Sequence, residues 1–185
     1  MSAEEASMGV IAIRCTTGFV TRPSCFERPA AGHPPPMSTN SSDPTSSPLT
    51  DDAKAMLSKP NPAVIATVRT DGHPVSAATW YLLRDDQVLV NMDVGRKRLD
   101  HLRRDPRVSL TVIDGDDWYT HVTVIGHVTE IYDDEGLADI DALSRHYQGK
   151  EYPDRKRPRV SALIAVDRVH GWGAQKNNDQ PDGRG

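Results

Sequence analysis

The chain has 185 residues, which is enough for one domain of ordinary size with a tail. Its formal net charge of -4 argues against a dedicated nucleic-acid-binding protein. No apolar run approaches the roughly 20 residues that span a bilayer, and the apolar residues 10–13 are too few for a signal peptide, so we expect a cytoplasmic protein without a membrane segment.

The first 48 residues have no sustained helical or strand periodicity and become rich in Pro, Ser, Thr and Asn toward their end. Such a composition buries too little apolar surface to offset its ordering entropy, so we predict a disordered tail over residues 1–48. One hypothesis is that Met37 is the native start and that residues 1–36 come from an upstream start-codon assignment. The only cysteines, Cys15 and Cys25, lie here and form neither a zinc motif nor a disulfide framework.

The domain then begins with a short helix and a hairpin. Thr50 is placed to cap a helix over residues 53–58. A strand rich in β-branched residues follows at residues 63–68. The pair Asp71 and Gly72 predicts the hairpin turn after it, because Asp-Gly favours the tight turns that join antiparallel strands.

The return strand is predicted over residues 74–83, with Trp80 and Tyr81 pointing to opposite faces. A polar turn separates it from a third strand at residues 87–92. Three strands joined by short turns in this way predict an antiparallel meander.

A basic helix is expected directly after the third strand, over residues 96–104, and Pro106 stops it. A loop that leads into a helix N-terminus presents free backbone N–H groups and a partial positive charge. Arg96, Lys97 and Arg98 add three cationic side chains at the same place. This chemistry suits an anion, and phosphate above all. The alternative is a solvated basic face of the helix.

The second half of the domain adds three strands and a helix. We predict a strand at residues 107–113 and a long strand at residues 118–132 with a bulge at Gly126. A helix at residues 134–147 and a last strand at residues 160–169 follow. Six strands with short helices outside predict a mainly β fold, a closed or nearly closed antiparallel barrel over residues 49–173. A polar C-terminal tail follows over residues 174–185.

Motifs for catalysis by the protein itself are absent from the sequence. It contains no Gly-x-Ser-x-Gly, no P-loop and no Gly-x-Gly-x-x-Gly. The acidic turn at residues 114–117 does not match the spacing of an EF-hand loop, and the histidines are scattered, so we expect no metal site. If the protein is an enzyme, we expect the chemistry to belong to a bound cofactor, and the sequence identifies no catalytic acid.

Two stretches resemble a known family. Residues 65–74 read IATVRTDGHP, and residues 88–110 read VLVNMDVGRKRLDHLRRDPRVSL. Together they resemble the pyridoxamine 5′-phosphate oxidase-like superfamily, of the flavin mononucleotide (FMN)-binding split-barrel type, over about residues 49–173. Within it, the chain is more similar to the coenzyme F420-dependent reductases of actinobacteria than to the FMN oxidases. The Arg-x-Arg-Leu-type ending of the true pyridoxamine phosphate oxidases is missing, which weakens a vitamin B6 substrate.

The resemblance implies a homodimer with two cofactor sites at the subunit interface. It also implies that basic residues at the helix start hold the cofactor phosphate, while the loop before the helix and two strand residues line the ring. The matching positions are Arg96, Lys97 and Arg98 at the helix start, Asn91, Met92 and Asp93 in the loop, Thr79 and Trp80 in the strand, His101 further along the helix, and Trp118 after the fourth strand. Arg98 stands where Lys is often found, and His101 where Asn is common.

The activity implied by the resemblance is an F420-dependent oxidoreductase, which passes a hydride from the reduced deazaflavin to a small unsaturated or heteroaromatic substrate. Two alternatives remain open: an FMN-dependent oxidase or reductase of the same fold, and a non-enzymatic protein that binds F420 or haem. F420 also carries a polyglutamate tail. A basic loop before the last strand could screen the charge of that tail, but a solvated loop explains its composition equally well. Its basic residues are Lys150, Arg155, Lys156, Arg157 and Arg159.

Overall fold

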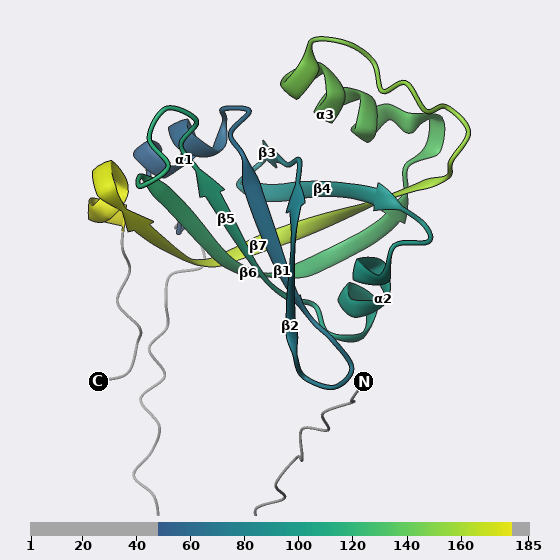
Figure 1. Cartoon of the computed structure of the whole chain (residues 1–185), viewed down its shortest axis with the longest axis horizontal. Coiled ribbons are helices and arrows are strands. Elements are labelled where there is room, and N and C mark those ends of the chain that lie inside the picture. Colours follow the sequence, from purple (N-terminus) through teal and green to yellow (C-terminus); the bar gives the residue numbers. More distant parts are fainter. Residues whose placement is uncertain (1–47, 179–185) are drawn as a thin grey trace, which may run out of the picture. The chain divides into compact units, whose positions relative to one another are not determined.

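A computed structural model gives the structure of the chain and describes residues 48–178 (Figure 1). The predicted disordered tail up to residue 47, the proposed start at Met37 and the end of the C-terminal tail lie outside these residues. In chain order the elements are α1 (Asp51–Leu57), β1 (Ala63–Val68), β2 (Pro74–Thr79), β3 (Leu82–Arg84), β4 (Gln87–Asp93), α2 (Lys97–Arg104), β5 (Arg107–Ile113), β6 (His121–Asp133), the 3-10 helix η1 (Glu135–Leu137), α3 (Ala138–Gln148), β7 (Arg159–Trp172) and the 3-10 helix η2 (Gly173–Asn178).

The strands form one antiparallel sheet in the order β2-β1-β5-β6-β7-β4-β3. The two edge strands, β2 and β3, follow each other in the chain and are separated only by Trp80 and Tyr81. A sheet whose opposite edges are joined by two residues must curl on itself, so it closes into a barrel that is split between β2 and β3. This confirms the mainly β, split-barrel fold with flanking helices.

Residues 48–178 form seven strands, whereas the sequence predicted six. The expected return strand over residues 74–83 breaks at Trp80, because its first half pairs with β1 and its second half pairs with β4. The meander is also incomplete, since β4 pairs next with the distant β7 and β1 pairs with β5. Long-range pairing of this kind leaves no local signal in the sequence.

Several local predictions are confirmed. As expected, the Thr50 hydroxyl accepts a hydrogen bond from a backbone N–H of the first turn of α1. The structure also shows that α3 ends at Gly149, which has a positive φ of 71°. The register between β6 and β7 shifts at Ile125 and Gly126, which is the expected bulge. A Cβ atom at Gly126 would clash with the backbone carbonyl of Ala165, so the close approach of β7 requires glycine there.

The fifth predicted strand starts later than expected. Residues 118–120 lie in a turn held by Asp117, whose carboxylate accepts hydrogen bonds from the Tyr119 N–H (3.1 Å) and the Thr120 hydroxyl (2.8 Å). β6 begins only after this turn. Trp118 therefore belongs to a loop rather than to a strand, which matters for the functional site.

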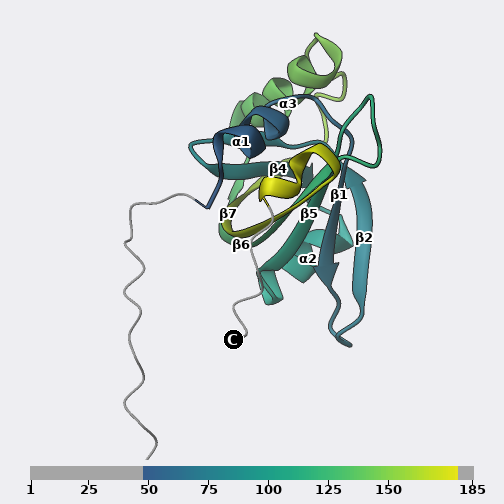
Figure 2. The ribbon, with the colours of Figure 1, turned by 90° about the vertical axis from the view of Figure 1, so that its left-hand side faces the viewer.

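The apolar faces of the strands fill the barrel, and the fully buried side chains include Ile65, Leu110, Val124 and Ile164. Helix α2 adds Leu99 and Leu102 to this core and packs against β1, as the side view in Figure 2 also shows. In the view of Figure 1, α3 lies above the end of β4 and α2 lies below it. Within residues 48–178, no helix is both long and apolar enough to cross a membrane.

Candidate functional site

A cavity of about 1040 Å³ lies among β1, β2, the end of β4, the start of α2, one face of α3 and the start of β7. Its lining has two chemically different ends. The charged end contains Asp93, Arg96, Lys97, Arg98, His101 and Arg159. The apolar end contains Ala63, Ile65, Ala78, Trp80, Ile140, Leu143 and Tyr147.

The packing of α2 decides which of its side chains reach the cavity. The helix buries Leu99 and Leu102 in the barrel core, and this fixes its rotation. Arg98 and His101 are three residues apart and therefore share another face of the helix, where both line the cavity. His101 is held in place because its Nδ1 lies 3.1 Å from the hydroxyl of the buried Thr67 on β1.

Arg98 is a half-buried cation at the charged end of the cavity. Within residues 48–178 it makes no ion pair, and its buried Nε has no hydrogen-bond partner. Burial and then the neighbouring charge of Arg96 lower the pKa of Arg98 below its usual value. Both effects oppose the charged form, and an anion bound at this end would relieve them.

A second arginine, Arg159, holds the opposite wall of the charged end. Its side chain is only 7% exposed, and its Nη1 donates to Asp93 Oδ1 at 2.8 Å. Its Nε donates to Asn91 Oδ1 at 2.5 Å, and its guanidinium lies 4.6 Å from the ring centroid of Tyr152. Asp93 also pairs with Arg96, whose Nε lies 3.2 Å from Oδ2. Asp93 is thus neutralised from two sides.

The charged end keeps a strong positive excess after these pairings. Its lining has four cationic side chains and one carboxylate, a net charge of +3 when His101 is neutral. The helix N-terminus of α2 points its partial positive charge at the same place. A phosphate group is negatively charged near neutral pH and therefore complements this positive excess.

The apolar end is built around one aromatic pair. The rings of Trp80 and Tyr147 are stacked, with centroids 5.3 Å apart and planes 13° apart. Trp80 lies at the split between β2 and β3, and Tyr147 comes from α3, so the pair joins the barrel to the helix. The Tyr147 hydroxyl donates to the backbone oxygen of Asn61 at 2.9 Å.

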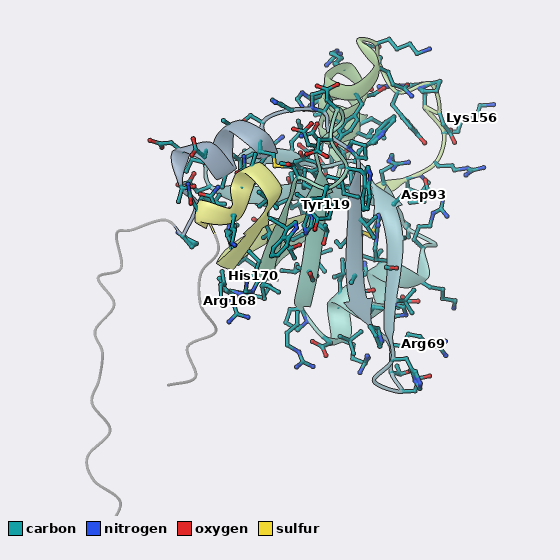
Figure 3. All side chains as sticks on the ribbon, turned by 60° about the vertical axis from the view of Figure 1, so that its left-hand side comes forward. Arg69, Asp93, Tyr119, Lys156, Arg168 and His170 are labelled. Carbon is teal, nitrogen blue, oxygen red and sulfur yellow. The ribbon has the colours of Figure 1, made fainter. Side chains whose placement is uncertain are left out.

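Nine of the ten residues expected from the sequence to bind a cofactor line this one cavity: Thr79, Trp80, Asn91, Met92, Asp93, Arg96, Lys97, Arg98 and His101. Trp118 does not. It is 78% exposed in the loop before β6, where its ring contacts Tyr119, which in turn contacts Trp172. Figure 3 labels Tyr119 of this aromatic cluster, and it shows Asp93 and Lys156 on one side of the barrel and His170 on the other.

Sequence reasoning assigned no site role to Tyr147 and placed Arg159 only in a basic loop. Arg159 is instead the first residue of β7, directly opposite Asp93 in the register of β4 and β7. The signal for Tyr147 was present, because it shares an apolar helix face with Ile140 and Leu143, but a core position explains that pattern equally well.

Behind the charged end, a buried polar network supports the start of α3. The Asp139 carboxylate accepts hydrogen bonds from the Ser161 hydroxyl (2.7 Å), the Tyr132 hydroxyl (2.7 Å) and Arg84 Nη2 (2.8 Å). Burial by itself would raise the pKa of Asp139, but these hydrogen bonds and the charge of Arg84 outweigh it and lower the pKa. The folded state therefore favours the ionised carboxylate.

This network makes stability sensitive to acid. Because the pKa of Asp139 is lower in the folded state, its contribution is present above the unfolded-state value of about 4 and is lost as the pH falls below it. We expect Asp139→Asn to lower the free energy of unfolding by about 1–2 kcal/mol at pH 7, and by less at pH 3. Urea denaturation between pH 7 and pH 3 measures this, with the exposed neighbour Asp133→Asn as the control. A difference that stays constant with pH would contradict the assignment.

The sequence profile of pyridoxamine 5′-phosphate oxidase matches residues 49–173, which is more than half of the chain. The chain belongs to the pyridoxamine 5′-phosphate oxidase family. The predicted membership of the superfamily and its split-barrel fold are thus confirmed. Membership supports an oxidoreductase of the flavin or deazaflavin kind, and the charged end of the cavity is where the phosphate of such a cofactor would fit.

Solved structures agree with the family assignment. An F420 reductase is 27% identical over 66% of this chain and 98% of its own length, with a TM-score of 0.61, in line with the likeness to such reductases seen in the sequence. The conserved hypothetical protein Rv2991 from Mycobacterium tuberculosis is 24% identical over 74% of this chain and 92% of its own, with a TM-score of 0.56. A putative pyridoxamine 5′-phosphate oxidase from Listeria innocua is 18% identical over 65% of this chain and 95% of its own, with a TM-score of 0.51. The Mycobacterium tuberculosis and Listeria innocua proteins share the fold of this chain.

Proposed function

We propose that the protein is an F420-dependent reductase that binds the cofactor phosphate at Arg98. The observation that carries this proposal is the half-buried guanidinium of Arg98, which has no counter-ion within residues 48–178 and lines a cavity end of net positive charge. A hydrogen-bonded anion is the partner that such a group requires. The similarity to an F420 reductase supports F420 as that partner.

The residues of the charged end have separate tasks in this proposal. Arg98 binds the phosphate, and Arg96 and Lys97 add charge at the mouth of the same end. Asn91 and Asp93, both fixed by the buried Arg159, keep the loop before α2 in one position. A site held by packed and hydrogen-bonded neighbours is organised before its ligand arrives, which lowers the entropy lost on binding.

The apolar end excludes water from the reacting atoms. When bound there, reduced F420 would supply a hydride to an electrophilic carbon of the substrate, and one proton from solvent would complete the reduction. Tyr147 is not the acid, because its hydroxyl already donates to Asn61 and burial raises the pKa of Tyr147 to about 12. The work of the protein is then to position the reactants rather than to transfer a proton.

The basic loop before β7 favours F420 over FMN, because only F420 carries a polyglutamate tail. Arg155 is already paired with Asp141 at 2.5 Å. Arg157 pairs with Asp154 at 3.2 Å but is 68% exposed, and it lines a second cavity of about 460 Å³ together with Arg96 and Asp93 of the main cavity. A tail that leaves the phosphate site would pass along this second cavity, where its carboxylates meet Arg157.

A fluorescence titration of the purified protein with F420 and, separately, with FMN tests the proposal. We expect F420 to bind with a micromolar or lower Kd and FMN to bind more weakly. A preference for FMN would make the protein an FMN-dependent oxidase or reductase of the same fold. If neither binds, the enzymatic proposal fails while the fold assignment stands.

We also propose that two copies of the chain pair and that Trp118 of the partner subunit completes each site. Trp118, Tyr119 and Trp172 are 78%, 53% and 44% exposed, which is unusual for large aromatic side chains that touch one another. Exposed aromatic clusters mark protein interfaces, and aromatic residues are enriched there. If a second copy packs on this cluster, Trp118 of one copy can reach the cavity of the other. It would then have the expected role at the site even though it does not line the cavity of its own chain.

Replacing Trp118 tests the pairing. We expect Trp118→Ser to weaken dimerisation by about 1–2 kcal/mol, or roughly five- to thirtyfold, since buried tryptophans are frequent interface hot spots. Sedimentation velocity over a range of protein concentrations measures the change. Arg103→Ser, exposed on α2, is the matched control. A wild-type protein that is monomeric at all concentrations would exclude this pairing.

A further inference from the structure

We infer that the loop over residues 149–158 is a strap that opens and closes over the charged end of the cavity, and that Asp141 on α3 is its latch. Asp141 is then a positioning residue, which acts through the strap and not on the ligand itself. This inference rests on the proposed function, because the ligand whose entry and release the strap controls is the cofactor.

The strap runs back along α3 from the far end of the helix to the start of β7 (Figure 1). Near its beginning it pairs with the last turn of the helix, where Arg145 Nη2 donates to Glu151 Oε1 at 2.7 Å. Its middle reaches Asp141, about one turn earlier in the helix. At its end, the Val94 N–H donates to the Pro158 backbone oxygen at 3.3 Å. The strap therefore connects α3 to the loop that leads into α2.

Two residues of the strap lie at the charged end of the cavity. Tyr152 lines the main cavity, and its ring centroid lies 4.6 Å from the guanidinium of Arg159. Arg157 lines the second cavity together with Arg96, which belongs to both cavities. An anion bound at the charged end would have the strap as part of its wall. A movement of the strap away from α3 would thus open this end to solvent.

Packing alone holds the strap only weakly. Tyr152 and Asp154 are half-buried, and every other residue of the strap is exposed. A segment with few buried apolar contacts opens locally at a small cost in free energy. Gly149, with its positive φ of 71°, lies where the strap leaves α3 and can absorb a change of backbone direction. The closed position therefore depends on particular polar contacts.

Asp141 supplies the strongest of these contacts. Its side chain is 9% exposed, and its Oδ1 accepts hydrogen bonds from Arg155 Nη1 at 2.5 Å and from the Tyr152 N–H at 3.0 Å. The hydrogen bond from Arg155, aided by that from Tyr152, outweighs burial and lowers the pKa of Asp141, so the latch is charged at neutral pH. The pair of Arg145 and Glu151 is 54% and 64% exposed, and such exposed pairs contribute little.

The place of Asp141 outside the binding site gives the strap a distinct kinetic signature. Asp141 is not among the residues that line the main cavity, so its removal frees the strap without deleting a contact to the ligand. A closed strap slows both entry and release. Loss of the latch should therefore raise the association and dissociation rate constants together and change Kd less than either. A purely structural defect would raise the dissociation rate constant alone.

Limited proteolysis of the full chain without ligand tests the latch. Cleavage by trypsin after Arg155 and Lys156, identified by mass spectrometry, requires the strap to leave α3. We expect Asp141→Ala to accelerate these cuts at least about tenfold, and Glu151→Gln, the matched control in the exposed pair, at most about twofold. Arg155→Gln breaks the same latch from the exposed side and serves, with the cut after Lys156, if Asp141→Ala does not fold. Wild-type protection in the latch variant would overturn the inference.

Stopped-flow fluorescence with F420 and, separately, with FMN tests the control of ligand exchange. We expect Asp141→Ala to raise both rate constants at least about fivefold while Kd changes less than about threefold. If F420 binds with wild-type rates, or only its dissociation is faster, the inference fails and the cofactor proposal stands. If FMN alone binds, with both rates raised, the strap stands and the F420 proposal fails. If neither binds, both fail.

Discussion

Arg98→Ala is expected to weaken binding of the phosphate-bearing cofactor by about 1.5–3 kcal/mol, or roughly 10- to 150-fold, which is the range for hydrogen bonds to charged groups. The reason is that Arg98 has no carboxylate to pair with in residues 48–178, so its guanidinium is available to the ligand. Arg96 is 67% exposed in its side chain and already pairs with Asp93, so Arg96→Ala should have a smaller effect. Fluorescence titration of both variants measures the difference.

The same substitution should not destabilise the cofactor-free protein. Arg98 is half-buried beside the like charge of Arg96, and both circumstances oppose its charged form. Removing such a group leaves the free energy of unfolding unchanged or slightly higher, whereas it removes affinity. Loss of affinity together with a large loss of stability would indicate a structural role for Arg98 and contradict this assignment.

Two comparisons isolate the phosphate contact. Arg103→Ala removes an exposed cation from the same helix without touching the cavity, so it should leave the affinity within about twofold. Arg98→Lys keeps the charge and loses the planar fork, so it should recover only part of the binding. If Arg103→Ala weakens binding as much as Arg98→Ala, long-range charge rather than a direct contact holds the cofactor.

The sequence located the charged end well because its information is local. A strand, a short loop, three cations and a helix stop at Pro106 lie within twenty residues, and the amphipathic pattern of α2 fixes which side chains turn toward the cavity. The hairpin turn at Gly72 and the cap at Gly149 were predictable for the same reason, since each depends on a residue that tolerates positive φ.

The remaining parts of the site depend on pairing between distant strands. Asp93 and Arg159 become neighbours only because β4 pairs with β7, and the break at Trp80 exists only because the two edges of the sheet meet there. Tyr147 reaches Trp80 through the path of α3 across the barrel. A single sequence carries no signal for these long-range contacts beyond the apolar periodicity, and that periodicity is satisfied by many arrangements.

Asp134 connects these distant elements, and its replacement should have the largest effect on stability. Its carboxylate accepts hydrogen bonds from the backbone N–H groups of Asp139 (2.9 Å) and Ile140 (3.0 Å) at the start of α3, and from the side chain of Asn91 (3.0 Å). Asn91 in turn holds Arg159. One buried carboxylate thus caps a helix and fixes the wall of the charged end.

Asp134→Ala should therefore impair both the fold and the site. Loss of a helix cap and of the acceptor for a buried amide predicts a decrease of about 2–4 kcal/mol in the free energy of unfolding. Thermal denaturation should show a fall in Tm of roughly 5–15 °C. Because Asn91 and Arg159 lose their support, cofactor affinity should fall as well, even though Asp134 does not line the cavity.

Two variants separate this role from a general effect of charge. Asp133→Ala removes the exposed neighbouring carboxylate and should change stability and affinity little, since Asp133 faces solvent. Asp134→Asn keeps one acceptor oxygen for the helix start and should be intermediate. Stability and affinity should decline together across the series from Asp134→Asn to Asp134→Ala, because one side chain supports both. A stability loss in Asp134→Ala with wild-type cofactor affinity would show that the helix cap and the charged wall are energetically independent.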